Sequence, residues 1–139
     1  MKYCHNQQFM DDGGMPYVAN IQQMTLQNDT FRTAVWTGHH LQMTVMCIPP
    51  CGEIGLEIHE HTDQFIRVEQ GTAVVKIGAD RRFLDFQKMM CQNDAVFIPA
   101  GTWHNIVNSG TCPLKVSVFY APPHHPSGTV HCTKADAER

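Results

Sequence analysis

The chain has 139 residues, of which 42% are hydrophobic and 17% are charged, and its formal net charge is −3 with the histidines neutral. This length suits one domain with its own buried core. The sequence contains no block of like charges, so nucleic acid and anionic membrane surfaces are not expected partners. The N-terminus lacks an apolar stretch of signal-peptide length, and nothing approaches a membrane span. We therefore predict a soluble cytoplasmic protein.

Cysteine and histidine are both frequent, with six and nine copies. The cysteines include no CxxC pair. Without a secretory signal, reduced thiols are a better expectation than a disulfide framework or a zinc site. The high number of histidines is not explained by these considerations and points to a function of their own.

Short β-forming segments dominate the chain. Residues 1–20 are polar and contain turn residues, so we predict an N-terminal arm there. From Ile21 onward β-forming residues prevail, and helical periodicity is almost absent. Turn residues separate about eight predicted strands, a pattern typical of an antiparallel sandwich or barrel. Apart from one strand across the central acid and histidines, the predicted strands span residues 31–38, 40–48, 64–70, 72–78, 83–90, 95–99, 103–108 and 114–121.

The last segment, residues 122–139, is predicted to be irregular. Thr133 and Asp136 have the spacing of a helix cap, which predicts a short terminal helix. His124, His125 and His131 lie in the preceding Pro-rich part. They are expected either over a binding site or against a partner subunit, with an ordinary surface loop as the default.

The most informative stretch is Cys51–Gly71. Glu57, His59 and His61 occupy every second position. Alternate side chains of a strand point to one face, so we predict that these three potential ligands lie on one side of one strand. Another histidine, His104, follows a Pro-x-Gly turn further along the chain.

These two segments resemble the paired motifs of the cupin superfamily, which are small antiparallel jelly-roll barrels that hold a metal at the barrel mouth. The second motif matches at Pro99, Gly101, His104 and Asn108, and Asn93 takes the place of its leading Gly. The resemblance covers roughly residues 40–121, and it implies an all-β jelly-roll fold with the conserved barrel in that range.

The first motif fits in two registers. Without gaps, Cys51 takes the first Gly position, Glu57 and His59 the two His positions, Gln64 the Glu position and Gly71 the last Gly position. The other register keeps His59 and His61 as the two histidines but breaks the spacing. We favour the gap-free register, because a strand accepts a changed ligand more easily than a slipped register.

The resemblance implies a divalent transition metal held by Glu57, His59, Gln64 and His104, with His61 as the alternative to Glu57. Iron, manganese, nickel, cobalt and zinc all accept such a set. Whichever of Glu57 and His61 does not bind the metal is a candidate acid or base, and Tyr120 is another candidate on the predicted inward face of the last strand.

Three functions remain open at this point. The first is a metal-dependent isomerase, epimerase or lyase that acts on a small sugar, uronate or keto acid by Lewis-acid polarisation and proton transfer. The second is an Fe(II) or Ni(II) dioxygenase. The third is a non-enzymatic metal-binding or small-molecule-binding protein. By analogy with small cupins, a homodimer is also expected.

Overall fold

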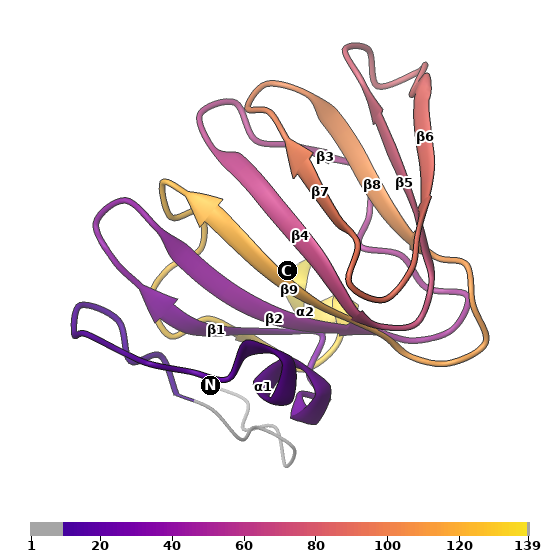
Figure 1. Ribbon diagram of the computed structural model, residues 1–139. Helices are drawn as coiled ribbons and strands as arrows, with labels where there is room; N and C mark the ends of the chain where they lie inside the picture. The colour runs from indigo at the N-terminus through magenta and orange to yellow at the C-terminus, as the bar shows by residue number, and fades with distance from the viewer. Residues whose placement is uncertain (1–9, 139) are drawn as a thin grey trace.

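Two antiparallel sheets form the protein, and they face each other around one core (Figure 1). The computed structural model describes residues 10–138. The six-stranded sheet has the order β10-β1-β2-β9-β4-β7, and the four-stranded sheet has the order β3-β8-β5-β6. The strands are β1 (Arg32–Thr37), β2 (Gln42–Ile48), β3 (Glu57–Ile58), β4 (Asp63–Gln70), β5 (Ala73–Gly78), β6 (Phe86–Met90), β7 (Ala95–Ile98), β8 (Trp103–Asn108), β9 (Leu114–Ala121) and β10 (Val130–His131). The predicted all-β antiparallel jelly-roll fold is confirmed.

Strand β9 lies in the middle of the larger sheet, where it pairs along its length with β2 and β4. Its alternate residues Leu114, Val116, Val118 and Tyr120 are buried in the shared core. This alternation follows from the two-residue period of a strand, which sends successive side chains to opposite faces. The inward face of β9 therefore fixes which side chains of β2 and β4 also point into the barrel.

A helix that the sequence analysis did not predict precedes the first strand. Helix α1 (Ile21–Gln27) begins after Asn20, whose side chain accepts a hydrogen bond from the backbone N–H of Gln23. The prediction that extended structure starts at Ile21 is therefore wrong. The helix covers the outer face of the larger sheet, where Met24 packs in a small second core with Val35, Met43 and Val45. Seven residues carry little helical periodicity, so this tertiary burial stabilises the helix.

The predicted terminal helix is present as α2 (Lys134–Ala137). Thr133 and Asp136 form a reciprocal capping box, in which each side chain bonds to the other residue's backbone N–H. The predicted strands at residues 72–78 and 83–90 also form an antiparallel pair, β5 and β6.

The cysteines follow the expectation only in part. Cys47, Cys51, Cys91 and Cys112 are free. Cys132 is disulfide-bonded, so the expectation of reduced thiols is wrong for this residue. Cys4 lies outside the described residues.

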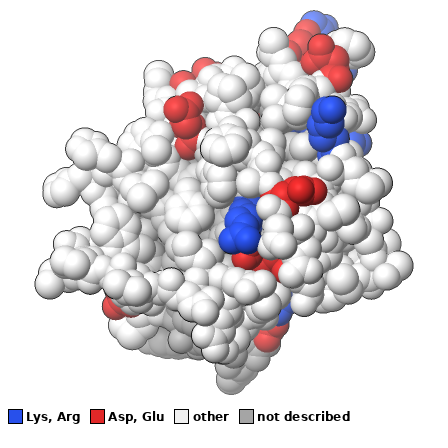
Figure 2. Space-filling view, in the orientation of Figure 1, with Lys and Arg blue, Asp and Glu red and all other residues white. Residues whose placement is uncertain are grey.

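The charge distribution agrees with the composition. On the face shown in Figure 2, charged side chains are few and the two signs are interspersed. Neither of the two helices in the described range has the length and apolar character that a membrane-crossing helix needs.

The Asp11 carboxylate joins the two ends of the described chain. It accepts hydrogen bonds from the Thr37 hydroxyl at 2.6 Å and from the backbone N–H of Gly128 at 2.9 Å. It also accepts bonds from the backbone of Gly13 and the hydroxyl of Ser127. Burial raises the pKa of Asp11, but these four bonds outweigh burial and lower the pKa below its ordinary value.

We expect Asp11→Ala to lower the free energy of unfolding by about 1–2 kcal/mol at pH 7, because two half-buried donors and two exposed donors lose their acceptor. The folded-state pKa is depressed, so this contribution is present above the ordinary Asp value of 3.8 and disappears as pH falls through the lower folded-state pKa. Urea denaturation of both proteins at several pH values measures the difference. The matched control is Asp12→Ala at the exposed neighbouring position. An equal effect of both substitutions would contradict the role of Asp11.

Candidate metal centre

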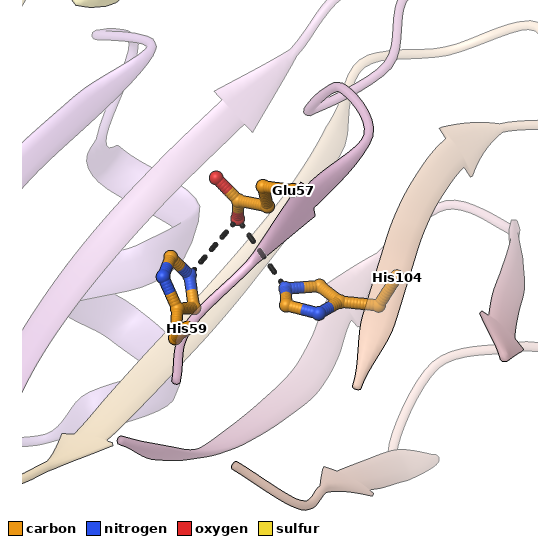
Figure 3. Close-up of side chains that lie close together, drawn as sticks. All are labelled: Glu57, His59 and His104. Atoms are coloured by element: carbon orange, nitrogen blue, oxygen red, sulfur yellow. Dashed lines mark hydrogen bonds and ion pairs between the residues drawn. The ribbon is translucent and has the colours of Figure 1, made fainter. Parts of the chain in front are cut away.

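Strand pairing brings an acid and two histidines together at one end of the barrel. Strands β3 and β8 pair so that Glu57 lies opposite His104. His59 follows β3 directly and is 7% exposed, and His104 is 2% exposed. The three side chains converge from these two neighbouring segments (Figure 3).

The Glu57 carboxylate lies between the two imidazoles. Its Oε1 is 3.3 Å from His59 Nε2 and 3.4 Å from His104 Nε2. One potential ligand atom from each residue lies within 4.8 Å of the others. Two imidazole nitrogens and a carboxylate oxygen are donors that divalent first-row metals accept. These three residues therefore form a group that could hold a metal ion.

The hydrogen bonding of His104 favours a cation at this point. Its Nδ1–H donates to the Thr102 carbonyl at 3.1 Å, so the Nε2 of the neutral ring presents a lone pair to the Glu57 carboxylate. Two electron-rich atoms at this distance repel each other unless a proton or a metal lies between them. A backbone carbonyl that orients the far ring nitrogen is also the usual support of a metal-binding histidine.

The charge of Glu57 is retained in this setting. Burial raises the pKa of the Glu57 carboxyl, but the contacts with His104 and His59 outweigh burial and hold the pKa well below its usual range. His59 Nδ1 is buried and has no hydrogen-bond partner in the part of the chain that the structure describes. The residues present thus fit a divalent metal.

His61 does not join this group, and the prediction of three ligands on one strand face is wrong. Strand β3 ends at Ile58, and the turn at Glu60–His61 leaves His61 exposed. The physical reason is that β3 belongs to the smaller sheet and β4 to the larger one. The chain changes sheets between Ile58 and Asp63, which interrupts the alternation.

Backbone conformation supports the gap-free register of the first motif. Cys51 and Asn93 replace the leading Gly of the two motifs, and their φ angles are 65° and 75°. Both are in the left-handed region that Gly adopts most easily. Counting from Cys51 without a gap places Glu57 at the first ligand position, and this is the residue that the structure brings to His59 and His104.

Gln64 lies at the start of β4, opposite Tyr120 and Ile98 of the neighbouring strands. It is 4% exposed, and its Oε1 has no hydrogen-bond partner among residues 10–138. This buried acceptor is on the inward face with Ile66 and Val68. Its role as a fourth ligand remains a prediction.

The Pro-rich segment after β9 is part of the site. The sequence analysis gave this position as an alternative and an ordinary surface loop as the default. The ring centroid of His124 is 4.0 Å from that of His59, and His124 also stacks on Tyr120. His125 Nε2 lies 3.3 Å from the Tyr120 hydroxyl. The only signal in the sequence was the density of histidines in this segment.

The side chain of Gln42 holds this segment in place. Its Oε1 accepts hydrogen bonds from the backbone N–H groups of His124 and His125, and its Nε2 donates to the His125 carbonyl at 2.8 Å. Gln42 is 0% exposed and lies opposite Tyr120 on β2. Together with Asp11, it holds residues 122–129, here named the C-terminal loop, against the barrel mouth.

Tyr120 is fully buried beside the metal group. Its ring centroid is 6.0 Å from that of His59. Burial raises the pKa of Tyr120 to about 12, and the positive charge of Arg32 acts in the opposite direction. The hydroxyl therefore keeps its proton at neutral pH and is available as a hydrogen-bond donor.

We expect Gln42→Leu to free the C-terminal loop and to lower the free energy of unfolding by about 1–3 kcal/mol, because the half-buried hydrogen bonds to the backbone of His124 and His125 are lost. Hydrogen exchange of these two amides should accelerate while exchange in β9 stays slow. Gln87→Leu on the exposed face of β6 is the matched control. Unchanged hydrogen exchange at His124 and His125 in Gln42→Leu would contradict the role of Gln42 in holding the C-terminal loop.

Comparison with known proteins places this geometry in a family. A relative from Bacillus subtilis (strain 168), named uncharacterized protein YrkC, is 54% identical over 127 residues, which cover 91% of this chain and 68% of the relative. The uncharacterized protein L612 of Acanthamoeba polyphaga mimivirus is 38% identical, over 82% of this chain and 70% of its own length. The crystal structure of BH2720 from Bacillus halodurans is 52% identical, with a TM-score of 0.92 over 93% of this chain and 98% of that one.

The family model described as the cupin domain matches residues 44–120, which run from β2 to β9 and include Glu57, His59 and His104. The match covers more than half of the chain and both sheets of the barrel. The chain belongs to the cupin family.

Proposed function

We propose that this protein is a metal-dependent enzyme that acts on a small oxygen-rich metabolite, as an isomerase, epimerase or lyase. The observation that carries the proposal is the position of the Glu57 carboxyl group between the Nε2 atoms of His59 and His104. A divalent metal bound there supplies a Lewis acid that polarises an oxygen atom of the substrate. Three protein donors leave coordination positions for that oxygen, as in catalytic rather than structural metal sites.

The chain's own residues have distinct tasks in this proposal. His104 is held by its bond to the Thr102 carbonyl, which keeps Nε2 directed at the metal position. Tyr120 holds its proton and donates a hydrogen bond to a substrate oxygen, and His125 lies within reach of the same hydroxyl. The imidazole of His124, packed on His59, is a further group that exchanges protons with a ligand at the mouth.

A dioxygenase is the second candidate, and one observation favours it. Two histidines and one carboxylate are the ligand set of many non-heme Fe(II) oxygenases. Oxygen consumption by the iron-loaded protein with catechol, diketone or thiol substrates would distinguish this activity from proton-transfer chemistry, which consumes none.

The first test is elemental analysis of the protein purified without added metal or chelator. We expect about one divalent transition-metal ion per chain in the parent. Glu57→Ala should lose most of this metal because the only charged donor is removed. His61→Ala is the matched control, since it removes a nearby but exposed imidazole, and it should keep its metal. Absence of metal from the parent after reconstitution, or metal loss in His61→Ala alone, would overturn the proposal.

The homodimer and the cytoplasmic location stay predictions. An exposed aromatic cluster supports the homodimer: Phe97 on the edge strand β7 is 75% exposed, and Phe65 contacts both Phe97 and Phe119. An unpaired edge strand beside such a patch is a surface that proteins usually cover.

We expect light scattering to give a dimer mass for the parent and a monomer mass for Phe97→Asp, because the new charge would be buried in the interface. Phe83→Asp changes an equally exposed phenylalanine in the β5–β6 hairpin and should leave the mass unchanged. A parent that is monomeric, or a Phe97→Asp variant that stays dimeric, would refute this interface.

A further inference from the structure

Among residues 10–138, five of the eight buried polar side-chain atoms without a hydrogen-bond partner lie on the inward side of the barrel, and the other three belong to Glu69 and Ser117. In most folded proteins, buried donors and acceptors find hydrogen-bond partners, so each exception needs an explanation. On the strands and loops around the mouth, the atoms that have no partner within the protein are Arg32 Nε, Thr44 Oγ1, Gln64 Oε1, His59 Nδ1 and His104 Nε2. The last two atoms belong to the candidate metal site. The other three atoms would stay without a partner even if a metal were bound there.

Arg32 is the most unusual of these three. It lies on β1 and is only 5% exposed. Its side chain forms a hydrogen bond with His131 Nδ1 at 3.1 Å, also interacts with the Tyr120 hydroxyl, and stands over the Phe31 ring. Among residues 10–138, no carboxylate lies within ion-pair distance of its guanidinium. The other well-buried cation, Lys115, has a carboxylate partner in Asp29 at 3.1 Å.

The surroundings of Arg32 offer no substitute for a counter-ion. Its histidine neighbours lose charge on burial: burial lowers the pKa of His131 below its ordinary value and that of His125 to about 3. A buried, unpaired guanidinium is costly, because hydration is lost and no opposite charge replaces it. An anion beside Arg32 would lower the free-energy cost of burying this charge.

Charge counting inside the barrel leads to the same result. The acidic and basic side chains on its inward side, among the described residues, are one carboxyl group, Glu57, and one guanidinium group, Arg32. A divalent cation held beside Glu57 would add two positive charges. In a site of low dielectric constant, such an excess favours an anionic ligand over a neutral one of similar shape.

We propose that Arg32 binds a carboxylate group of the substrate, so that the ligand of this barrel is a small carboxylic acid and not a neutral polyol. The inference rests on the proposed function, since it names the substrate class of the same site. Thr44 is paired with Val118 of β9 and Ala34 of β1, on the inward face with Arg32, and its hydroxyl supplies a second donor for the carboxylate. Tyr120 stands between Arg32 and His59, and its hydroxyl donates to an oxygen atom between the two ends of the ligand.

The fit of a planar guanidinium to a carboxylate gives a specific expectation for variants. Arg32→Gln removes the charge, whereas Arg32→Lys keeps the charge but cannot form two parallel hydrogen bonds. Arg82→Gln is the matched control: it removes the same charge from a side chain that is 85% exposed.

The experiment measures binding of malonate, neutral malonamide and inorganic phosphate to the metal-loaded parent by calorimetry. We expect malonate to bind more tightly than malonamide or phosphate. Arg32→Gln should weaken the binding of malonate by about tenfold or more, because one charge-assisted interaction is lost. The binding of malonamide should not change. Arg32→Lys should be intermediate, and Arg82→Gln should match the parent. Circular dichroism checks that each variant folds.

Two results would overturn the proposal. One is a malonate affinity in the parent no higher than that of malonamide, a comparison that needs no folded variant. The other is an equal loss of malonate and malonamide binding in Arg32→Gln, which would mean that Arg32 only supports the structure around Tyr120 and His131. Tighter binding of phosphate than of malonate would also contradict the proposal, because the site would then be specific for another anion.

The metal content of the same samples separates the two proposals. If the parent holds no metal but malonate binding depends on Arg32, the enzyme proposal fails and the anion site stands. If the metal is present and malonate binding does not depend on Arg32, only the carboxylate inference fails.

Discussion

The contact of Glu57 with two imidazole nitrogens is the constraint on which the mouth of this barrel depends. A carboxylate that stays ionised in a largely buried position needs positive or proton-donating neighbours. The Nε2 atoms of His59 and His104 lie 3.3 and 3.4 Å from this carboxylate, so a proton or a metal ion between these atoms meets that need, and the pairing of β3 with β8 holds all three residues in place. Because β3 has only two residues, this alignment depends on β8, which β5 pairs along its length.

The two ends of the described chain complete the mouth that the barrel strands begin. Asp11 and Gln42 both hold the C-terminal loop, one through Gly128 and the other through the backbone of His124 and His125. The loop in turn presses the His124 ring on His59. Closure of the site therefore rests on hydrogen bonds to main-chain atoms that are made by one buried side chain, Gln42, and one half-buried side chain, Asp11.

Charge is distributed differently on the two sides of the larger sheet. On its outer side, Lys115 and Arg67 have carboxylate partners in Asp29 and Glu69. On its inner side, Arg32 and Glu57 do not pair with each other. Among the described residues, buried polar atoms without a hydrogen-bond partner occur on both sides, for example in Thr44 and Gln64 inside and in Glu69 and Ser117 outside. The unpaired charges are groups that a ligand can complete, so the inner side has the character of a binding site and the outer side that of a scaffold.

Sequence alone determined the strands and the local capping of this protein. The alternation of apolar residues in β9, the turn residues between strands and the Thr133–Asp136 cap depend on neighbours within a few positions. The motif spacing likewise predicted His59 and His104 as partners, and in its gap-free register it put Glu57 beside them.

Tertiary structure decided what depends on distant residues. It separates His61 from Glu57 and His59, because the chain changes sheets after Ile58. It stabilised α1 by burying Met24 against the larger sheet. It also brought Arg32, Gln42 and His124, each unremarkable in its local sequence, to one mouth. Local patterns could not predict these placements, because strand pairing and loop closure set them across many tens of residues.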